Sequence, residues 1–162
     1  MIALRKMNED QYRGFIDYFI SDYAIEIMQN YNKNKENALR IAMHEISIDL
    51  PEGIHTKSNV LLCIDREEKD SSELIGYLWY KENIGESSIF IYDFYIQPEY
   101  RNKGYGKRSM IMLEDNLKNS QIKQIKLRVA YSNEKALALY KELGFNITGI
   151  NMAKNIIDNE ES

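Results

Sequence analysis

A seven-residue segment that is rich in glycine and basic side chains, Arg101-Asn102-Lys103-Gly104-Tyr105-Gly106-Lys107, constrains the fold of this chain more than any other feature. It follows a β-branched and aromatic run at 89–96 and precedes a helical pattern at 108–117, so it joins a strand to a helix. Such a loop presents backbone N–H groups and the positive end of the helix dipole to an anion. The two glycines let the backbone adopt positive φ or approach a ligand closely. The segment predicts a phosphate-binding loop in an α/β fold.

Two other phosphate-binding loops do not fit this segment. A P-loop requires Ser or Thr after Gly-Lys, but Arg108 follows Lys107. A dinucleotide-binding loop would have Gly or Ala where Ser109 stands, and an acidic residue about 20 positions further on. Residues 125–128 offer no acidic residue. A tight turn surrounded by solvated lysines remains the alternative to a phosphate site for this segment taken alone.

Length and charge limit the remaining possibilities. The 162 residues predict one domain over 1–157, followed by an acidic tail at 158–162 that we expect to be frayed. The net charge of −4 argues against a general nucleic-acid binder. Residues 97–108 nevertheless carry four basic side chains against Glu99. The expected partner of this basic patch is a compact anion.

The sequence contains no sign of a membrane, disulfide or metal partner. Apolar runs are too short to span a bilayer, and the charged N-terminal segment does not fit a signal peptide. We therefore expect a cytoplasmic protein without membrane binding. The single cysteine, Cys63, lies in an apolar run, and neither His44 nor His55 has zinc-ligand spacing around it. No metal is expected.

Hydrophobic periodicity predicts a mixed order of elements. A short strand at 4–7 precedes a helix that Asn8 or Asp10 could cap, and a second helix ends near 50–53. Three strands follow, and the loop and its helix come next. We then expect a strand at 122–129, a helix at 134–143 and a strand at 145–153. The predicted fold class is α/β of the mixed (α+β) kind, in which some helices and strands alternate and others are grouped along the chain.

Two motifs in the second half resemble one known family. Residues 94–107 read Phe-Tyr-Ile-Gln-Pro-Glu-Tyr-Arg-Asn-Lys-Gly-Tyr-Gly-Lys and closely resemble the acetyl-CoA signature of GNAT-type N-acetyltransferases, whose core is Arg-x-x-Gly-x-Gly. A second family signature is matched by Asn133, Ala136, Leu139-Tyr140 and Gly144-Phe145. The resemblance covers about residues 89–153. It implies a mixed, mostly antiparallel sheet that is flanked by about four helices and splayed where acetyl-CoA enters.

The resemblance also implies how acetyl-CoA is bound. The pyrophosphate would lie on backbone amides of the loop, with Arg101 at its mouth. The pantetheine arm would pair like an added strand with the strand before the loop, and an amide there would hold the oxyanion that develops. The implied cofactor-binding residues are Phe94, Tyr95, Ile96, Arg101, Asn102, Lys103, Gly104, Tyr105, Gly106, Lys107, Asn133 and Ala136. Asn133 can also cap the last helix.

Two side chains are the candidates for proton transfer. The resemblance implies that Tyr140 donates a proton to the leaving CoA thiolate, whereas its alternative role is that of a core tyrosine. The amine must lose a proton before it attacks, because a lysine-like amine has a pKa of about 10.4. Asp93, on the strand before the loop, is the candidate base, Tyr92 is an alternative, and a purely structural Asp93 is the third possibility.

The expected activity is direct acetyl transfer from acetyl-CoA to a primary amine, without an acyl-cysteine intermediate at Cys63. The sequence does not identify the amine. The first two helices and the loop near Pro51 to Asn59 would shape its pocket. Four tyrosines could line it or pack in the core: Tyr12, Tyr18, Tyr23 and Tyr31. The alternatives are a CoA-binding sensor without turnover, and an interaction domain in which residues 101–108 hold an acidic partner. The resemblance also allows a homodimer.

Overall fold

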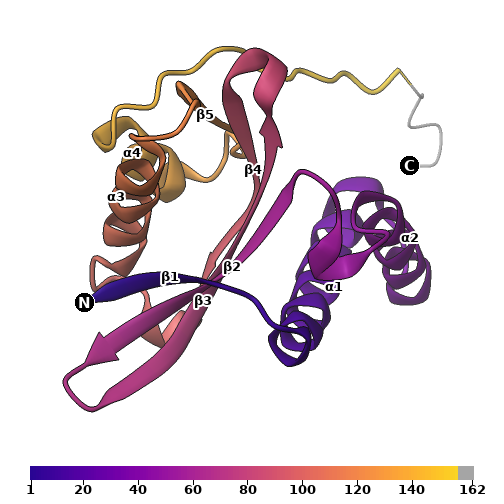
Figure 1. Cartoon of the computed structure of the whole chain (residues 1–162). Helices are drawn as coiled ribbons and strands as arrows, with labels where there is room; N and C mark the ends of the chain where they lie inside the picture. Colours follow the sequence, from indigo (N-terminus) through magenta and orange to yellow (C-terminus); the bar gives the residue numbers. More distant parts are fainter. Residues whose placement is uncertain (157–162) are drawn as a thin grey trace. The chain divides into compact units, whose positions relative to one another are not determined.

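The computed structural model describes residues 1–156, which belong to two compact units, Met1–Arg128 and Val129 onward. Each unit is described by itself. The first contains β1 (Ile2–Lys6), α1 (Glu9–Tyr31), α2 (Lys35–Asp49), β2 (Asn59–Glu68), β3 (Ser71–Asn83), β4 (Ser88–Ile96), α3 (Tyr105–Leu117) and β5 (Gln124–Leu127) (Figure 1). The second contains α4 (Glu134–Glu142). Three short 3₁₀ turns lie at Gly53–His55, Ile84–Glu86 and Pro98–Tyr100.

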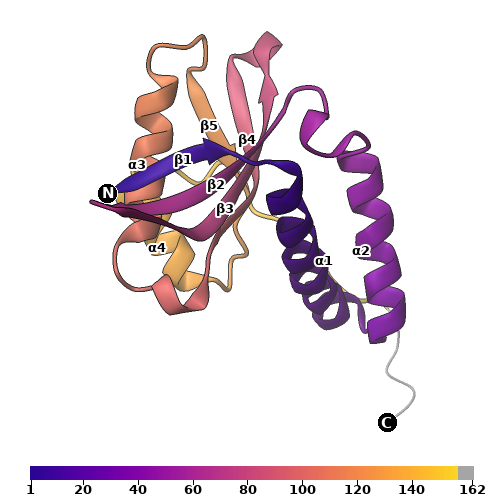
Figure 2. The same cartoon turned by 60° about the horizontal axis from the view of Figure 1, so that its bottom comes forward.

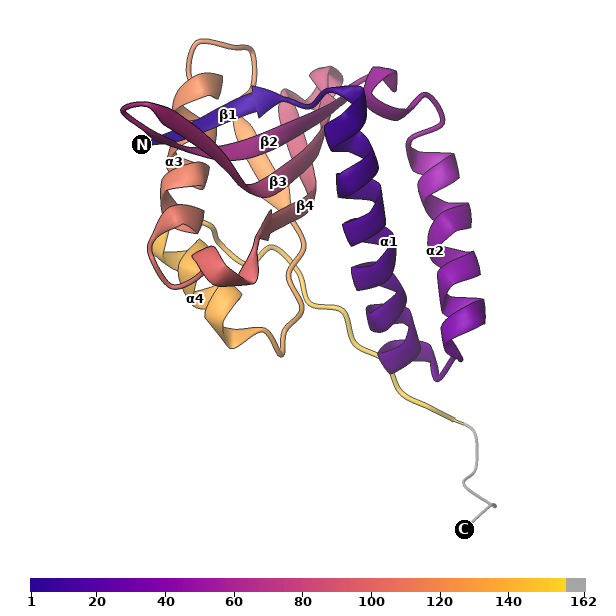
Figure 3. The same ribbon diagram turned by 90° about the horizontal axis from the view of Figure 1, so that it is seen from below.

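The first unit is built on one five-stranded sheet with the order β1-β2-β3-β4-β5. The first four strands pair antiparallel, while β5 pairs parallel to β4. A parallel pair needs a crossover connection, and α3 supplies it. In Figures 2 and 3, α3 lies on one side of the sheet and the pair α1–α2 on the other. This sheet and the four helices confirm the predicted fold class.

Local sequence signals account for the first two helices. Asn8 accepts a hydrogen bond from the backbone of Gln11, whose side chain bonds back to the Asn8 amide, so a capping box starts α1. Asn32 ends α1 in the left-handed conformation with φ 51°. Asn34 then caps α2 through the amide of Asn37. Of the two predicted caps for α1, Asn8 holds that position and Asp10 lies inside the helix.

An aromatic core joins α1 to the sheet. Phe15 is fully buried, and its ring lies 5.4 Å from that of Tyr77 and 6.3 Å from that of Trp79. Cys63 is buried in the same cluster. Between α1 and α2 the contact is made by small and aliphatic side chains: Ala24, Ile27, Ala38 and Ala42. The alanines allow close approach of the two helices, and Tyr23 of α1 packs against this cluster.

A β-bulge interrupts the pairing of β3 with β4. Trp79 pairs with Asp93, and Tyr80 pairs with Ile91, so Tyr92 is an extra residue in β4. A bulge locally twists a strand and changes the direction of its side chains. Here the Tyr92 ring stacks on Trp79 at 5.0 Å, and the carboxylate of Asp93 reaches Tyr18 of α1. The bulge therefore turns two consecutive side chains to the α1 face of the sheet.

Gly76 allows β3 and β4 to approach each other closely. A Cβ at this position would lie 2.1 Å from the backbone oxygen of Tyr95. Because this neighbour is backbone, it cannot move aside without shifting β4. We expect Gly76→Ala to lower the free energy of unfolding by about 1–3 kcal/mol or more, as overpacking does. Denaturant titration measures it, with Gly149→Ala as the control, since a Cβ there meets no atom within 4 Å. Equal stability of both variants would contradict this account.

Two predictions about the last third of the chain need correction. The strand expected at 122–129 is confirmed only as Gln124–Leu127. The strand expected at 145–153 is wrong, because residues 145–156 form no helix or strand. Alternating apolar residues favour a strand only where a neighbouring strand completes the hydrogen bonds, and no described strand pairs with this segment. Ile150 is accordingly 62% exposed and Met152 is 92% exposed. The predicted frayed tail at 158–162 lies outside the described residues.

Candidate functional site

The glycine-rich loop connects β4 to α3, as predicted. Asn102 and Gly104 both have positive φ, 62° and 84°. Gly104 occupies the N-cap position of α3 and provides no side-chain cap, so the first-turn amides of this helix are not capped by a side chain. A Cβ at Gly104 would meet no atom within 4 Å. Residues 101–104 are exposed, and the loop thus has the space and the donors that a phosphate group requires.

Arg101 is held at the mouth of the loop by β4. Its Nε donates a hydrogen bond to the carbonyl oxygen of Ile96 at 2.7 Å, and its guanidinium lies 5.2 Å from the centre of the Tyr95 ring. A cation over an aromatic face is attracted to it. Lys103 is also held locally, because its Nζ donates to the carbonyl oxygen of Glu99 at 3.1 Å. Both basic side chains are therefore positioned before any ligand arrives.

Two residues of the β2–β3 hairpin contact Tyr100, which directly precedes the loop. Arg66 pairs with Glu73 at 2.8 Å and lies 5.7 Å from the centre of the Tyr100 ring. The Tyr100 hydroxyl also donates to Glu73. Arg66 and Glu73 were not among the predicted residues. No sequence signal indicates them, because they lie about 30 residues before the loop on a different hairpin.

The second half of β4 has an unpaired edge in the described chain. Pairing with β5 ends at Ile91 and Leu127, whereas β4 continues to Ile96. The Gln97 amide donates a hydrogen bond to the carbonyl oxygen of Ile75 on β3. Because the backbone N–H and C=O groups of successive strand residues face opposite sides, those of Tyr95 also face β3. The backbone groups of Phe94 and Ile96 therefore face the open side. This is the splay that the resemblance implied. An extended ligand could pair there as an added strand.

Asp93 lies beside this edge in a half-buried environment. The Tyr18 hydroxyl donates to its two carboxylate oxygens at 2.9 and 3.2 Å. Burial raises the pKa of Asp93 to about 7; the hydrogen bond from Tyr18 lowers it and the charge of Asp22 raises it. At neutral pH this carboxylate can therefore exchange a proton, which an ordinary aspartate does not do. Asp22 was not among the predicted residues, although it lies four residues after Tyr18 on one helix face.

Tyr18 is held in a stack of aromatic rings. Its ring lies 3.8 Å from that of Tyr95 and 5.7 Å from that of Tyr77. Burial and the neighbouring Asp93 both raise the pKa of Tyr18, so its hydroxyl stays protonated and acts as a donor. Among the other tyrosines expected near an acceptor pocket, Tyr23 donates to Glu45 and Tyr31 is 69% exposed.

The remaining predicted residues lie in the second unit, on α4. Asn133 caps this helix by accepting a hydrogen bond from the Ala136 amide at 3.1 Å. Tyr140 is half-buried, and its ring lies 5.5 Å from that of Phe145. Gly144 follows the helix with φ 95° and ends it. The first unit thus brings together Asp93, residues 94–96 and residues 101–107, while Asn133, Ala136 and Tyr140 belong to the second.

Cys63 is buried, and its surroundings affect the reactivity of its thiol. Burial raises the pKa of Cys63 to about 11, so its thiol is a poor nucleophile at neutral pH. Within residues 1–156, no group of three or more histidine, cysteine or carboxylate side chains is arranged to hold a metal ion. None of the described helices combines the length and apolar character that a membrane span requires.

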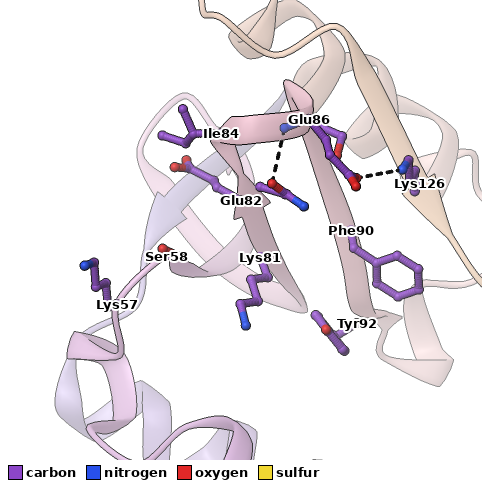
Figure 4. A pocket seen from close by; sticks show the side chains of 11 residues that line it. Lys57, Ser58, Lys81, Glu82, Ile84, Glu86, Phe90, Tyr92 and Lys126 are labelled. Carbon is purple, nitrogen blue, oxygen red and sulfur yellow. Dashed lines mark hydrogen bonds and ion pairs between the residues drawn. The ribbon is translucent and has the colours of Figure 1, made fainter.

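A pocket with a volume of about 720 Å³ opens at the start of β4 in the first unit. Phe90 and Tyr92 of β4 line it, together with Lys81 of β3 and Lys57 before β2 (Figure 4). At its far side Lys126 of β5 pairs with Glu86 at 3.2 Å. This size and mixture of aromatic and charged groups suit a small molecule.

Comparison with known proteins agrees with this geometry. A sequence model of the acetyltransferase (GNAT) family matches residues 24–145. The uncharacterized N-acetyltransferase YycN of Bacillus subtilis (strain 168) is 29% identical over 157 residues, 96% of this chain and 99% of the relative. A crystal structure of YycN superposes with a TM-score of 0.86, covering 98% of this chain and all of that chain. A spermidine N-acetyltransferase from Vibrio cholerae, crystallised with CoA and spermine, has a TM-score of 0.65 at 23% identity, covering 97% of this chain and 88% of its own.

Proposed function

Because the chain belongs to the acetyltransferase (GNAT) family, we propose that it transfers the acetyl group of acetyl-CoA directly to a primary amine. The observation that carries the proposal is the junction of β4 and α3. There, an open strand edge leads directly into a loop whose following helix has a first turn without a side-chain cap. A pyrophosphate with an extended arm has the shape and charge to occupy both.

The residues of this junction have separate roles. The amides from Asn102 to Lys107 bind the pyrophosphate, and the backbone of Phe94 and Ile96 binds the pantetheine arm. Arg101 keeps the two segments in register, since it already bonds to Ile96 and packs on Tyr95. The Vibrio cholerae enzyme, which has the same fold, was crystallised with both CoA and an amine, spermine, and this supports acetyl-CoA and an amine as the two substrates.

Asp93 is the proposed general base. A primary amine with a pKa of about 10.4 is almost entirely protonated at pH 7, and its attack therefore requires a proton acceptor. The pKa of Asp93 is about 7, which brings its proton affinity closer to that of the amine than an exposed aspartate can. The hydrogen bond from Tyr18 orients the carboxylate.

Acetyl-CoA, when bound, supplies the thioester carbonyl that forms the new C–N bond and the sulfur that leaves as the C–S bond breaks. Asp93 accepts the proton that the amine loses, directly or through one water molecule. A backbone amide at the open edge of β4 stabilises the charge that develops on the carbonyl oxygen. Tyr140 donates a proton to the departing thiolate.

We also propose that residues 1–157 act as one catalytic domain. The family match at 24–145 spans the end of the first unit and the start of the second, and both proposed proton-transfer residues, Asp93 and Tyr140, lie within the matched residues.

The proton-donor role is tested by Tyr140→Phe. The variant keeps the ring and should bind acetyl-CoA like wild type. Its turnover should fall about 10- to 100-fold. This loss is at or below the lower end of the range for general acid–base catalysis, because a thiolate is a stable leaving group even without a proton donor. Release of free thiol in the presence of an amine library measures turnover, and calorimetry measures binding. Tyr131→Phe is the control, since this exposed tyrosine lies in the same unit.

The same experiment separates the alternatives. A core role for Tyr140 would lower the stability of the variant and leave its turnover near wild type. A CoA-binding sensor would bind acetyl-CoA but release no thiol with any amine. Absence of acetyl-CoA binding by the folded wild-type protein would overturn the proposed function.

A further inference from the structure

The pocket at the start of β4 opens on the same face of the sheet as Asp93. Trp79 of β3 packs against Phe15 of α1 and pairs with Asp93, so both point to the α1 side. The Tyr92 ring stacks on Trp79 and lies 5.0 Å from that of Phe90. A continuous aromatic surface therefore leads from Asp93 into the pocket.

The charge of the pocket changes sign along this surface. Asp93 and Asp22 lie at one end. At the other end, Lys57 and Lys81 line the pocket, and neither forms an ion pair in the described chain. Glu82 and Glu86 also line the pocket, so its three lysines face two carboxylates. Lys126 is already neutralised by Glu86.

The strand geometry sets the distance between the two ends. Lys81 is two residues beyond Trp79, whose partner is Asp93. Two residues of a strand span roughly 7 Å, and the lysine side chain adds some reach. A ligand that contacts both ends would carry opposite charges roughly 7–10 Å apart.

We propose that the acetyl acceptor is a small amine with an anionic group, a carboxylate or a phosphate, at its other end. The anion binds Lys81 and Lys57, the hydrocarbon chain lies on Phe90 and Tyr92, and the amine reaches Asp93. This inference rests on the proposed acetyl transfer and specifies the substrate for it.

Acidic side chains near the pocket define the competing outcome, a diamine. Glu45 already accepts a hydrogen bond from Tyr23. Burial raises the pKa of Asp49, the charge of Glu45 adds to that rise, and Lys81 opposes it. Neither carboxylate lines the pocket. Of the two carboxylates that do line it, Glu86 pairs with Lys126, which leaves Glu82 against Lys57 and Lys81. This excess of positive charge disfavours a second cation.

The experiment compares four acceptors that share a six-carbon chain: 6-aminohexanoate, 6-aminohexyl phosphate, hexylamine and 1,6-diaminohexane. For wild type, kcat/KM should be about 10- to 100-fold higher for at least one anionic acceptor than for hexylamine, as one charged hydrogen bond provides. The first two probes distinguish a carboxylate from a phosphate. In Lys81→Met and Lys57→Met the ratio should fall towards one, whereas Lys69→Met, on the exposed β2–β3 turn, keeps it.

Direct binding of the same probes separates this inference from the proposed function. Calorimetry with wild type and Lys81→Met should show binding of an anionic probe that the substitution weakens about tenfold or more. Such binding without any acetylation would support the pocket and contradict the transferase. Acetylation that favours the diamine, or that does not distinguish hexylamine from the anionic probes, would overturn the inference and leave the transferase standing.

Discussion

Gly104→Glu should abolish acetyl-CoA binding and leave the protein folded. Gly104 has φ 84° and stands at the start of α3, where a Cβ would meet no atom of the protein within 4 Å. The new carboxylate would therefore occupy the space in front of the uncapped amides and repel the pyrophosphate. Loss of two charged hydrogen bonds, at about 1.5–3 kcal/mol each, corresponds to a loss in affinity of more than a hundredfold.

Gly104→Ala is the matched control for this variant. It imposes the same left-handed strain, about 1–2 kcal/mol, without adding a charge. We expect its affinity for acetyl-CoA, measured by calorimetric titration, to lie between those of wild type and Gly104→Glu, and the thermal midpoints of the two variants to be similar. Binding of acetyl-CoA by Gly104→Glu with unchanged affinity would show that the loop does not hold the pyrophosphate.

Local sequence signals were sufficient to predict the glycine-rich loop and most of the helices and strands. The two glycines of the loop were predicted to allow positive φ or a close approach to a ligand, and Gly104 has positive φ whereas Gly106 lies inside α3. Asn8 and Asn133 were identifiable as caps because capping depends on neighbours within one helical turn. The predicted order of strand, two helices and three strands depended on hydrophobic period in the same way. These features appear in the structure because their physical cause is local.

Features that depend on distant partners could not be predicted. Tyr18 and Asp93 are 75 residues apart, and only the packing of α1 on the sheet brings them together. The bulge at Tyr92 depends on the register of β3 against β4, which no pattern within β4 reveals. The same reasoning explains the wrong strand at 145–153, where alternation was present but a pairing strand was not.

Asp93→Asn should reduce kcat/KM about 10²- to 10³-fold, within the range attributed to general bases. Asparagine keeps the shape and can still accept the hydrogen bond from Tyr18, but it cannot accept a proton. In wild type, kcat/KM should rise with pH through about 7, because the ionised form of Asp93 is the active one and its pKa is about 7. The variant should lack this rise but should retain the pH dependence of kcat/KM that comes from deprotonation of the acceptor amine.

The pH dependence of the free energy of unfolding provides an independent measure of the ionisation of Asp93. The folded-state pKa of Asp93 is raised above its ordinary value of 3.8, so the folded state binds more protons than the unfolded state between these values. The contribution of Asp93 to the free energy of unfolding should therefore fall as pH rises from about 4 to about 7. Denaturant titrations of Asp93→Asn across this range should lack that fall.

Two controls decide whether Asp93 acts as the base. An acceptor amine that is already neutral at pH 7 does not need proton removal before attack, so Asp93→Asn should slow its acetylation much less. Tyr92→Phe removes the alternative base and should leave kcat/KM within about twofold, because Tyr92 is 47% exposed and its ring keeps the stack on Trp79. If Asp93→Asn altered stability but preserved the rate and its pH profile, Asp93 would be structural, and the proton would have to leave through Tyr92 or through water.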